Sequence, residues 1–138
     1  MISLWFQKLI LALAGLAALV IGLTILLAPA AFYAFYALDL GPDPTLRSDL
    51  RATACGLTLL GGLMLSGVMI TRLRWAATAL AGGVFFAYAV GRLLSLALDG
   101  APHPGMIDAA LIELALGLLC GVSLWLQSRS PAPDRALA

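Results

Sequence analysis

Four long runs of apolar residues divide the chain, and each is long enough to cross a lipid bilayer as a helix. They cover residues 9–28, 52–70, 75–98 and 106–126. The first run has 20 residues and no charge, and as a helix it spans about 30 Å, the thickness of the hydrocarbon layer. Only helices and closed barrels satisfy the backbone in lipid, and uninterrupted runs do not alternate as barrel strands do. The pattern predicts an all-α integral membrane protein with four transmembrane helices in an antiparallel bundle.

The residues between the runs contain signals for helix ends. Asp43 followed by Pro44 is typical of a helix start, because the carboxylate caps free backbone N–H groups and Pro fits the first turn. Asp99-Gly100-Ala101-Pro102 is typical of a helix end. The link over 71–74 is so short that the helices it joins must be antiparallel neighbours. We expect helices at about 5–28, 44–71, 74–99 and 105–127, which form one domain over 1–127, followed by a polar tail over 128–138.

The first apolar run is followed by an aromatic segment and is flanked by residues that resemble a signal peptide. Residues 29–38 hold four aromatic residues within five positions, and such rings prefer the headgroup level, so we expect a short interfacial segment. Lys8, the apolar run and Ala28-Pro29-Ala30 also fit a cleaved signal peptide. Because the run exceeds the usual signal core of about 7–15 residues, a retained membrane anchor is the favoured interpretation.

Composition supports a membrane protein and excludes several other classes. The chain is 62% hydrophobic and 11% charged, whereas soluble domains are about 25% charged. The net charge of +1 leaves no basic patch for nucleic acid. Lys8, Arg72, Arg74, Arg129 and Arg135 fall on the side of the termini, against three basic residues on the other side. This bias predicts that both termini are cytoplasmic.

Two charged residues lie well below the membrane boundary in the predicted spans, on consecutive helices. Arg92 lies seven residues before Asp99, at the end of the third span, and Glu113 lies seven residues after Met106, at the start of the fourth. At about 1.5 Å per residue both are about 10 Å below the same membrane boundary. Because an unpaired charge in hydrocarbon costs several kcal/mol, we expect a salt bridge between Arg92 and Glu113.

Residues at helical spacing extend this pair into a candidate site. Tyr88, Arg92 and Ser95 share one face of the third span. On the second span we expect an inward stripe of polar and small residues, Arg47, Arg51, Cys55, Thr58 and Gly62. Gly117 and Gly121 form a GxxxG pattern that permits close approach of the fourth span. The candidate cluster comprises Arg51, Arg92, Glu113, Tyr88, Ser95 and Thr58, with Asp49 and Asp108 as outer partners.

The cluster has two interpretations. Its charges can be purely structural and fix the helix register, or they can bind a ligand, as intramembrane charges often do. Two cations and one carboxylate favour an acidic or phosphate-bearing head group over a cation.

The remaining chemistry-bearing residues are isolated. His103 is the single histidine and lies in a predicted external loop, which excludes paired-His haem ligation within this chain and predicts a solvated residue rather than a metal ligand. Cys55 and Cys120 differ too much in depth to form a disulfide. The sequence has no catalytic-triad, nucleotide-binding or zinc-binding pattern. We expect no enzyme activity and no cofactor other than a bound lipid or quinone.

Three stretches, LRATACGLTLLGG, YAVGRLLSLALDGAPHP and LIELALGL, resemble the bacterial four-helix membrane family catalogued as domain of unknown function 4345. The resemblance covers about residues 5–126 and is most specific at Arg51-Ala52, Gly91-Arg92, Asp99-Gly100 with Pro102, and Glu113. Thr53 and Cys55 depart from the family's glycine-rich run, which leaves the polarity of the site open. More distantly, the chain is similar to the DoxX-like group, some of whose members are accessory subunits of quinone-linked oxidoreductases. The resemblance implies the bacterial inner membrane.

Two functions follow as expectations. The first is a non-catalytic accessory or structural subunit that packs against a larger membrane complex or a second copy, which short loops and small-residue helix faces favour. The alternative is a module that binds or transports a lipid, quinone or other anionic amphiphile at the Arg/Glu cluster in the outer leaflet. An enzyme would need chemistry performed by Arg, Glu and Tyr alone.

Overall fold

The computed structural model describes residues 2–129 and contains helices joined by short turns and loops, with no strand in that range. The helices are α1 (Ile2–Leu27), α2 (Pro29–Ala34), α3 (Pro44–Met69), α4 (Arg74–Asp99) and α5 (Pro104–Arg129), with a 3-10 turn, η1 (Thr71–Leu73). Four of them are long and apolar enough to cross a membrane. The predicted all-α fold with four candidate membrane spans is confirmed.

The predicted helix ends lie within three residues of those in the structure: α1 begins at Ile2 rather than at about 5, and α3 ends at Met69 rather than at about 71. Local signals set the start of α3 and the end of α4. The Asp43 carboxylate accepts a hydrogen bond from the Thr45 N–H at 2.8 Å, and Pro44 opens α3. Gly100, with φ of +93°, follows the last residue of α4, a conformation that favours glycine. The interfacial aromatic segment forms α2 and a following turn. α5 continues two residues beyond the predicted end at 127, and the rest of the predicted tail, 130–138, lies outside the described residues.

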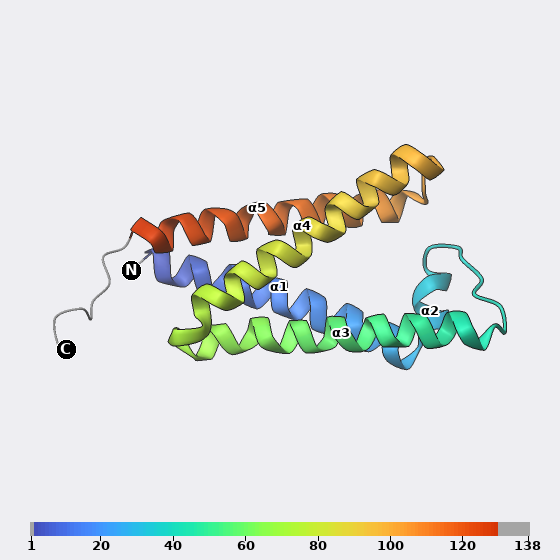
Figure 1. The fold of residues 1–138 in the computed structure, drawn as a ribbon, viewed down its shortest axis with the longest axis horizontal. Helices are drawn as coiled ribbons and strands as arrows, with labels where there is room; N and C mark the ends of the chain where they lie inside the picture. Colours follow the sequence, from blue (N-terminus) through green and yellow to red (C-terminus); the bar gives the residue numbers. More distant parts are fainter. Residues whose placement is uncertain (1, 130–138) are drawn as a thin grey trace.

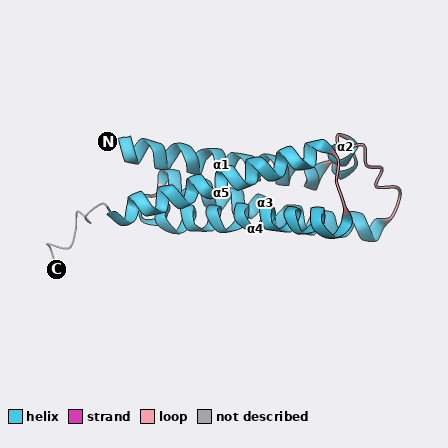
Figure 2. Ribbon diagram, turned by 90° about the horizontal axis from the view of Figure 1, so that it is seen from above, coloured by secondary structure: helices cyan, strands magenta, loops and turns pink. Residues whose placement is uncertain are grey.

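The long helices form two closely packed pairs, α1 with α3 and α4 with α5. Figure 1 shows that α3 and α4 meet at η1 and then diverge, so that α2 lies near the widest part of the bundle. α1 begins and α5 ends at the opposite end from α2 (Figure 2). This divergence separates the two pairs on one side of the bundle, near the predicted site.

The inward face of α3 differs from the predicted one. Its buried residues are Ala54, Leu57, Gly61, Met64 and Gly67, and the first three lie one position before members of the predicted stripe. One position is about 100° of rotation around a helix, so the expected inward orientation of Arg51, Cys55 and Gly62 is wrong, and all three are exposed. The face of α3 that packs against α1 consists of apolar and small residues, because burying a charged side chain against an apolar helix costs solvation free energy.

Glycines allow the helices within each pair to approach closely. A Cβ added to Gly61 would lie 2.6 Å from the Leu19 nitrogen of α1, so the two backbones are in contact there. On α5, a Cβ added to Gly117 would lie 2.9 Å from the Phe86 ring. Gly121, the other half of the predicted GxxxG pattern, is exposed, and a Cβ added there would have nothing within 4 Å. Only Gly117 therefore has the close-packing role that the pattern predicts.

A second polar network, which the sequence pattern did not predict, lies at the end of the bundle opposite α2. Thr78 is fully buried and donates to the Arg74 carbonyl at 2.7 Å. Gln127 donates to the Thr78 hydroxyl at 3.4 Å and to the Ser123 hydroxyl at 3.3 Å. These bonds connect the start of α4 to the end of α5, and neutral groups make them, so nothing in the charge pattern indicated them.

Adjacent glycines on α3 test the close contact between α1 and α3. Gly61→Ala should destabilise the protein by about 2 kcal/mol, because the added methyl overlaps the α1 backbone. Gly62→Ala should be neutral or stabilise by about 0.5 kcal/mol, because nothing lies within 4 Å of its Cβ position. Thermal unfolding of both variants in the same detergent measures the difference. Equal unfolding temperatures would contradict the predicted backbone contact.

Candidate functional site

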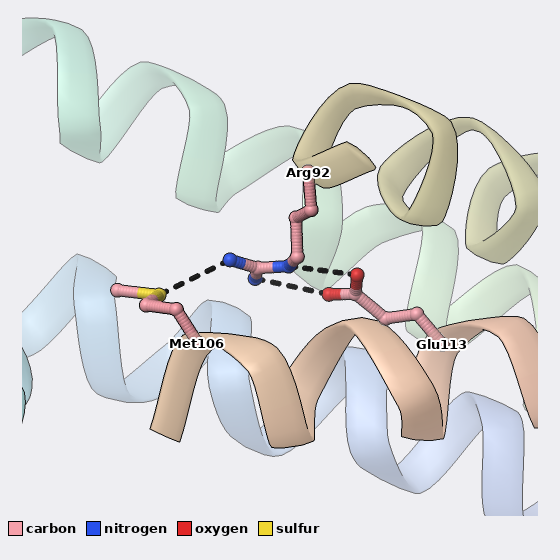
Figure 3. A network of polar contacts seen from close by, with 3 residues as sticks. All are labelled: Arg92, Met106 and Glu113. Atoms are coloured by element: carbon pink, nitrogen blue, oxygen red, sulfur yellow. Dashed lines mark hydrogen bonds and ion pairs between the residues drawn. The ribbon is translucent and has the colours of Figure 1, made fainter. Parts of the chain in front are cut away.

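The centre of the candidate site is a paired charge between α4 and α5. The Arg92 Nε donates to Glu113 Oε2 at 2.8 Å, and Nη2 donates to Oε1 at 3.0 Å. Nη1 of the same guanidinium donates to the Met106 sulfur at 3.1 Å. Figure 3 shows the guanidinium reaching from α4 to α5, with its two ends facing Met106 and Glu113. The predicted salt bridge is confirmed, and Met106 is an additional partner.

The ion pair has the bidentate geometry that makes arginine–carboxylate contacts strong. Two parallel N–H to O bonds match the fork of the guanidinium to the carboxylate, and both are charge-assisted. The side chains are 33% and 13% exposed within the isolated chain. In hydrocarbon each charge needs the other, because an isolated ion would lose several kcal/mol of solvation. The pair therefore fixes how α4 and α5 sit against each other at this depth.

The pair borders an inner cavity of about 170 Å³ between the two helix pairs. The polar residues in its lining are Arg92, Glu113, Thr53 and the tyrosines Tyr33, Tyr36 and Tyr88. The rest of the lining is mainly apolar and comes from all five helices, with Ile21 of α1, Leu57 of α3 and Phe85 of α4 among its residues. The result is a small apolar chamber with hydrogen-bonding groups in its wall.

A wider groove of about 770 Å³ adjoins this cavity. Its walls include apolar residues of α3 and α4 such as Leu60, Val84 and Ala87. Tyr36, Tyr88, Arg92 and Met106 line both spaces, so the guanidinium lies where the groove meets the cavity. The groove lies between Leu60 of α3 and residues 84–95 of α4, the two helices that diverge in Figure 1.

The aromatic segment after α1 forms part of the site rather than a simple interfacial belt. Tyr33 and Phe32 of α2 line the inner cavity, and Tyr36 lines both spaces. Burial raises the pKa of the Tyr33 phenol, so this group stays protonated at neutral pH and can donate a hydrogen bond. The Tyr36 ring meets the His103 ring edge to face, with centroids 6.0 Å apart. The four clustered aromatics in the sequence were the available signal for this role.

The loop between α4 and α5 also contributes to the groove. His103 lines the groove, and its Nδ1 accepts a hydrogen bond from the Gly105 N–H at 3.1 Å. Its predicted loop position is confirmed, and its contact with Tyr36 adds a structural role at the rim of the groove. Among residues 2–129, no three His, Cys, Asp or Glu side chains gather closely enough to hold a metal ion.

The structure brings together only part of the predicted cluster. Tyr88 and Ser95 line the groove, and the Ser95 hydroxyl donates to the Asp99 carboxylate at 2.9 Å. Arg51 instead donates from Nε to the Leu26 carbonyl at 3.3 Å, at the end of α1. Thr58 donates to the Ala54 carbonyl at 2.8 Å, at the contact of α3 with α1.

Neither Arg51 nor Thr58 lines the cavity or the groove, and the same is true of the expected outer partners Asp49 and Asp108. The convergence of Arg51, Thr58 and Asp49 on the ion pair was predicted from the wrong face of α3, and Asp108 is exposed on α5. Without Arg51, the inner cavity has one guanidinium and one carboxylate in its lining, Arg92 and Glu113. The expected surplus of positive charge at the site is therefore wrong.

Comparison with known proteins identifies a family. The profile of the family described as "Domain of unknown function (DUF4345)" matches residues 6–126, and the chain belongs to this family. This confirms the resemblance carried by the three sequence stretches. No match was found among curated proteins or among solved structures.

A double-mutant cycle tests the energetic role of the ion pair. Arg92→Met should lower the free energy of unfolding by about 3 kcal/mol, because it leaves the Glu113 carboxylate without its partner. The double variant Arg92→Met with Glu113→Leu should recover at least half of that loss, because an apolar pair leaves no uncompensated charge. Thermal or denaturant unfolding in one detergent measures these two variants and the single variant Glu113→Leu, which completes the cycle. Simple addition of the two single effects would show that the groups do not interact.

Proposed function

We propose that this member of the DUF4345 family is a non-enzymatic binding module for a membrane amphiphile. The ligand's polar head lies at the Arg92–Glu113 pair, and its hydrocarbon tail lies in the groove between α3 and α4. The observation that carries the proposal is the junction of an apolar groove of about 770 Å³ with a small polar-lined cavity at the Arg92 guanidinium. Ligand sites are typically of about this size, mostly apolar, with a few convergent polar groups.

The hydrogen-bonding capacity of the site supports this proposal. A guanidinium has five N–H donors, and Arg92 uses three of them, two for Glu113 and one for Met106. The phenol oxygens of Tyr33, Tyr36 and Tyr88 make no hydrogen bond to another residue within 2–129. A purely structural ion pair has no use for unpaired donors beside an open groove. The polar head group of a ligand would accept hydrogen bonds from them.

The distribution of charge supports a location and an orientation. We propose the bacterial inner membrane, with both termini in the cytoplasm. Among the described residues, Lys8 lies in the first third of α1, Arg72 in η1 and Arg129 at the end of α5. The start of α1 and the end of α5 lie at one end of the bundle (Figure 2), and the positive-inside rule makes a basic end the cytoplasmic one. The groove and the ion pair then belong to the outer leaflet.

A different observation favours a second function, an accessory subunit that packs against another membrane protein. A separate groove of about 660 Å³ runs along the α4–α5 pair, and its lining includes the exposed Gly83 and Gly121. Small residues at exposed helix faces allow another transmembrane helix to approach closely. This surface does not overlap the amphiphile groove, so one protein can have both functions.

Native mass spectrometry of protein extracted in mild detergent tests the binding module. The wild-type chain should retain a copurified amphiphile, and Glu113→Gln should lower its occupancy at least tenfold, because the change frees the Arg92 side chain from its fixed position. Asp108→Asn is the matched control, since Asp108 is on the same helix but lines neither space. Gly91→Leu should also expel the ligand, because this glycine lines the groove and has open space at its Cβ position. Equal occupancy in the wild type, Glu113→Gln and Gly91→Leu would refute the proposal.

Cross-linking in native membranes tests the accessory role. Gly83→Leu should abolish a specific cross-linked species, because the new side chain fills the α4–α5 groove without a clash inside the chain. Gly62→Leu, which adds the same side chain to an exposed position of α3, should leave that species unchanged. A cross-linking pattern that responds equally to both variants would argue against this surface.

A further inference from the structure

We infer that the polar head of the ligand is a neutral six-membered ring with carbonyl or hydroxyl oxygens, which enters the inner cavity while a single hydrocarbon tail remains in the groove. The quinones and alkylphenols of membranes have this chemistry. This inference rests on the proposed amphiphile-binding function and deepens it. It also replaces the anionic head group that the sequence predicted.

The balance of charge excludes an anionic head. Among the described residues that line the cavity or the groove, Arg92 is the one Lys or Arg side chain, and Glu113 already neutralises it through two hydrogen bonds. An incoming phosphate or carboxylate would have to displace Glu113 and leave that carboxylate unpaired at low dielectric. An unpaired charge of this kind is strongly unfavourable. A neutral head avoids it.

The volume of the inner cavity limits the size of the ligand's polar head group. A closed apolar cavity of about 150 Å³ is known to hold one benzene molecule, and the inner cavity measures about 170 Å³. One substituted ring therefore fills it. A glycerol head with two ester-linked chains is larger than one ring and branched, so a cavity of about 170 Å³ does not hold it as a unit.

The wall of the cavity suits a flat ring with oxygens on its edge. Phe32, Phe85 and Tyr33 line it, and aromatic groups of this kind pack on a ring by edge or offset contacts. The donors are the Tyr33 and Tyr88 phenols and the two N–H groups of Arg92 that remain uncommitted. Oxygen atoms of a ring accept from these donors, and a plain hydrocarbon would leave them unsatisfied.

Three probes with the same decyl tail test the head group. They are decylbenzoquinone, decyl phosphate and 1-decanol, each titrated into the full chain in phosphatidylcholine nanodiscs and measured by equilibrium dialysis. Decylbenzoquinone should bind at least tenfold more tightly than either of the others. Tyr88→Phe should weaken its binding about tenfold, the loss of one hydrogen bond of about 1.4 kcal/mol, and should leave 1-decanol binding unchanged.

A pair of alanine substitutions separates the cavity from the groove. Ala109 lines only the cavity and Ala87 lines only the groove. Ala109→Leu should abolish the preference for decylbenzoquinone over 1-decanol and leave weak binding of both, whereas Ala87→Leu should weaken all three probes together. Thermal unfolding of each variant establishes that it is folded.

The outcomes distinguish this inference from the proposed function on which it rests. Tighter binding of decyl phosphate than of decylbenzoquinone, lost in Gly91→Leu, would overturn the neutral ring head and keep the amphiphile site. Equal binding of all three probes would also overturn the inference. Binding of none of the probes, together with no copurified amphiphile in the wild type, would refute the proposed function itself.

Discussion

The salt bridge between Arg92 and Glu113 is the interaction on which the arrangement of the site depends. Two charges placed in hydrocarbon must meet, because either one alone loses several kcal/mol of solvation. Their bidentate contact at 2.8 and 3.0 Å fixes the depth and rotation of α4 relative to α5. It also holds the guanidinium at the junction of the cavity and the groove.

Close packing within two helix pairs explains why a groove exists at all. Gly61 brings α3 against the backbone of α1, and Gly117 brings α5 against Phe86 of α4. Lipid chains are as apolar as the helices, so association depends on such packing and on polar contacts rather than on hydrophobic burial. The strongest packing lies within the pairs, and η1 joins α3 to α4 at one end only. The pairs therefore diverge towards α2, and their separation leaves space for the groove and the cavity.

The two proposed functions, amphiphile binding and packing against another membrane protein, use two different grooves of the bundle. The amphiphile groove combines apolar walls with hydrogen-bond donors that the protein leaves uncommitted, which is a property of a ligand site. The α4–α5 groove has glycines and apolar side chains without a polar centre, which is a property of a helix contact. The polar network of Thr78, Ser123 and Gln127 lies at the far end of the bundle. Its donors and acceptors pair with one another, which is a property of a structural contact.

The sequence by itself determined the elements of local origin: four spans, their ends at Asp43-Pro44 and Gly100, and the pairing of Arg92 with Glu113. The length of an apolar run, the capping residues at a helix end and the cost of an intramembrane charge each involve one helix or two consecutive helices. Their effects can therefore be predicted from the spacing of residues along the sequence. Only the tertiary structure decided which face of α3 is buried. Several stripes of α3 have helical spacing, and the choice among them depends on how closely each can approach α1. That choice removed Arg51 and Thr58 from the site, so no second cation accompanies the Arg92–Glu113 pair. The packing of the aromatic segment after α1 and of the start of α5 brought Tyr33, Tyr36 and Met106 into the site.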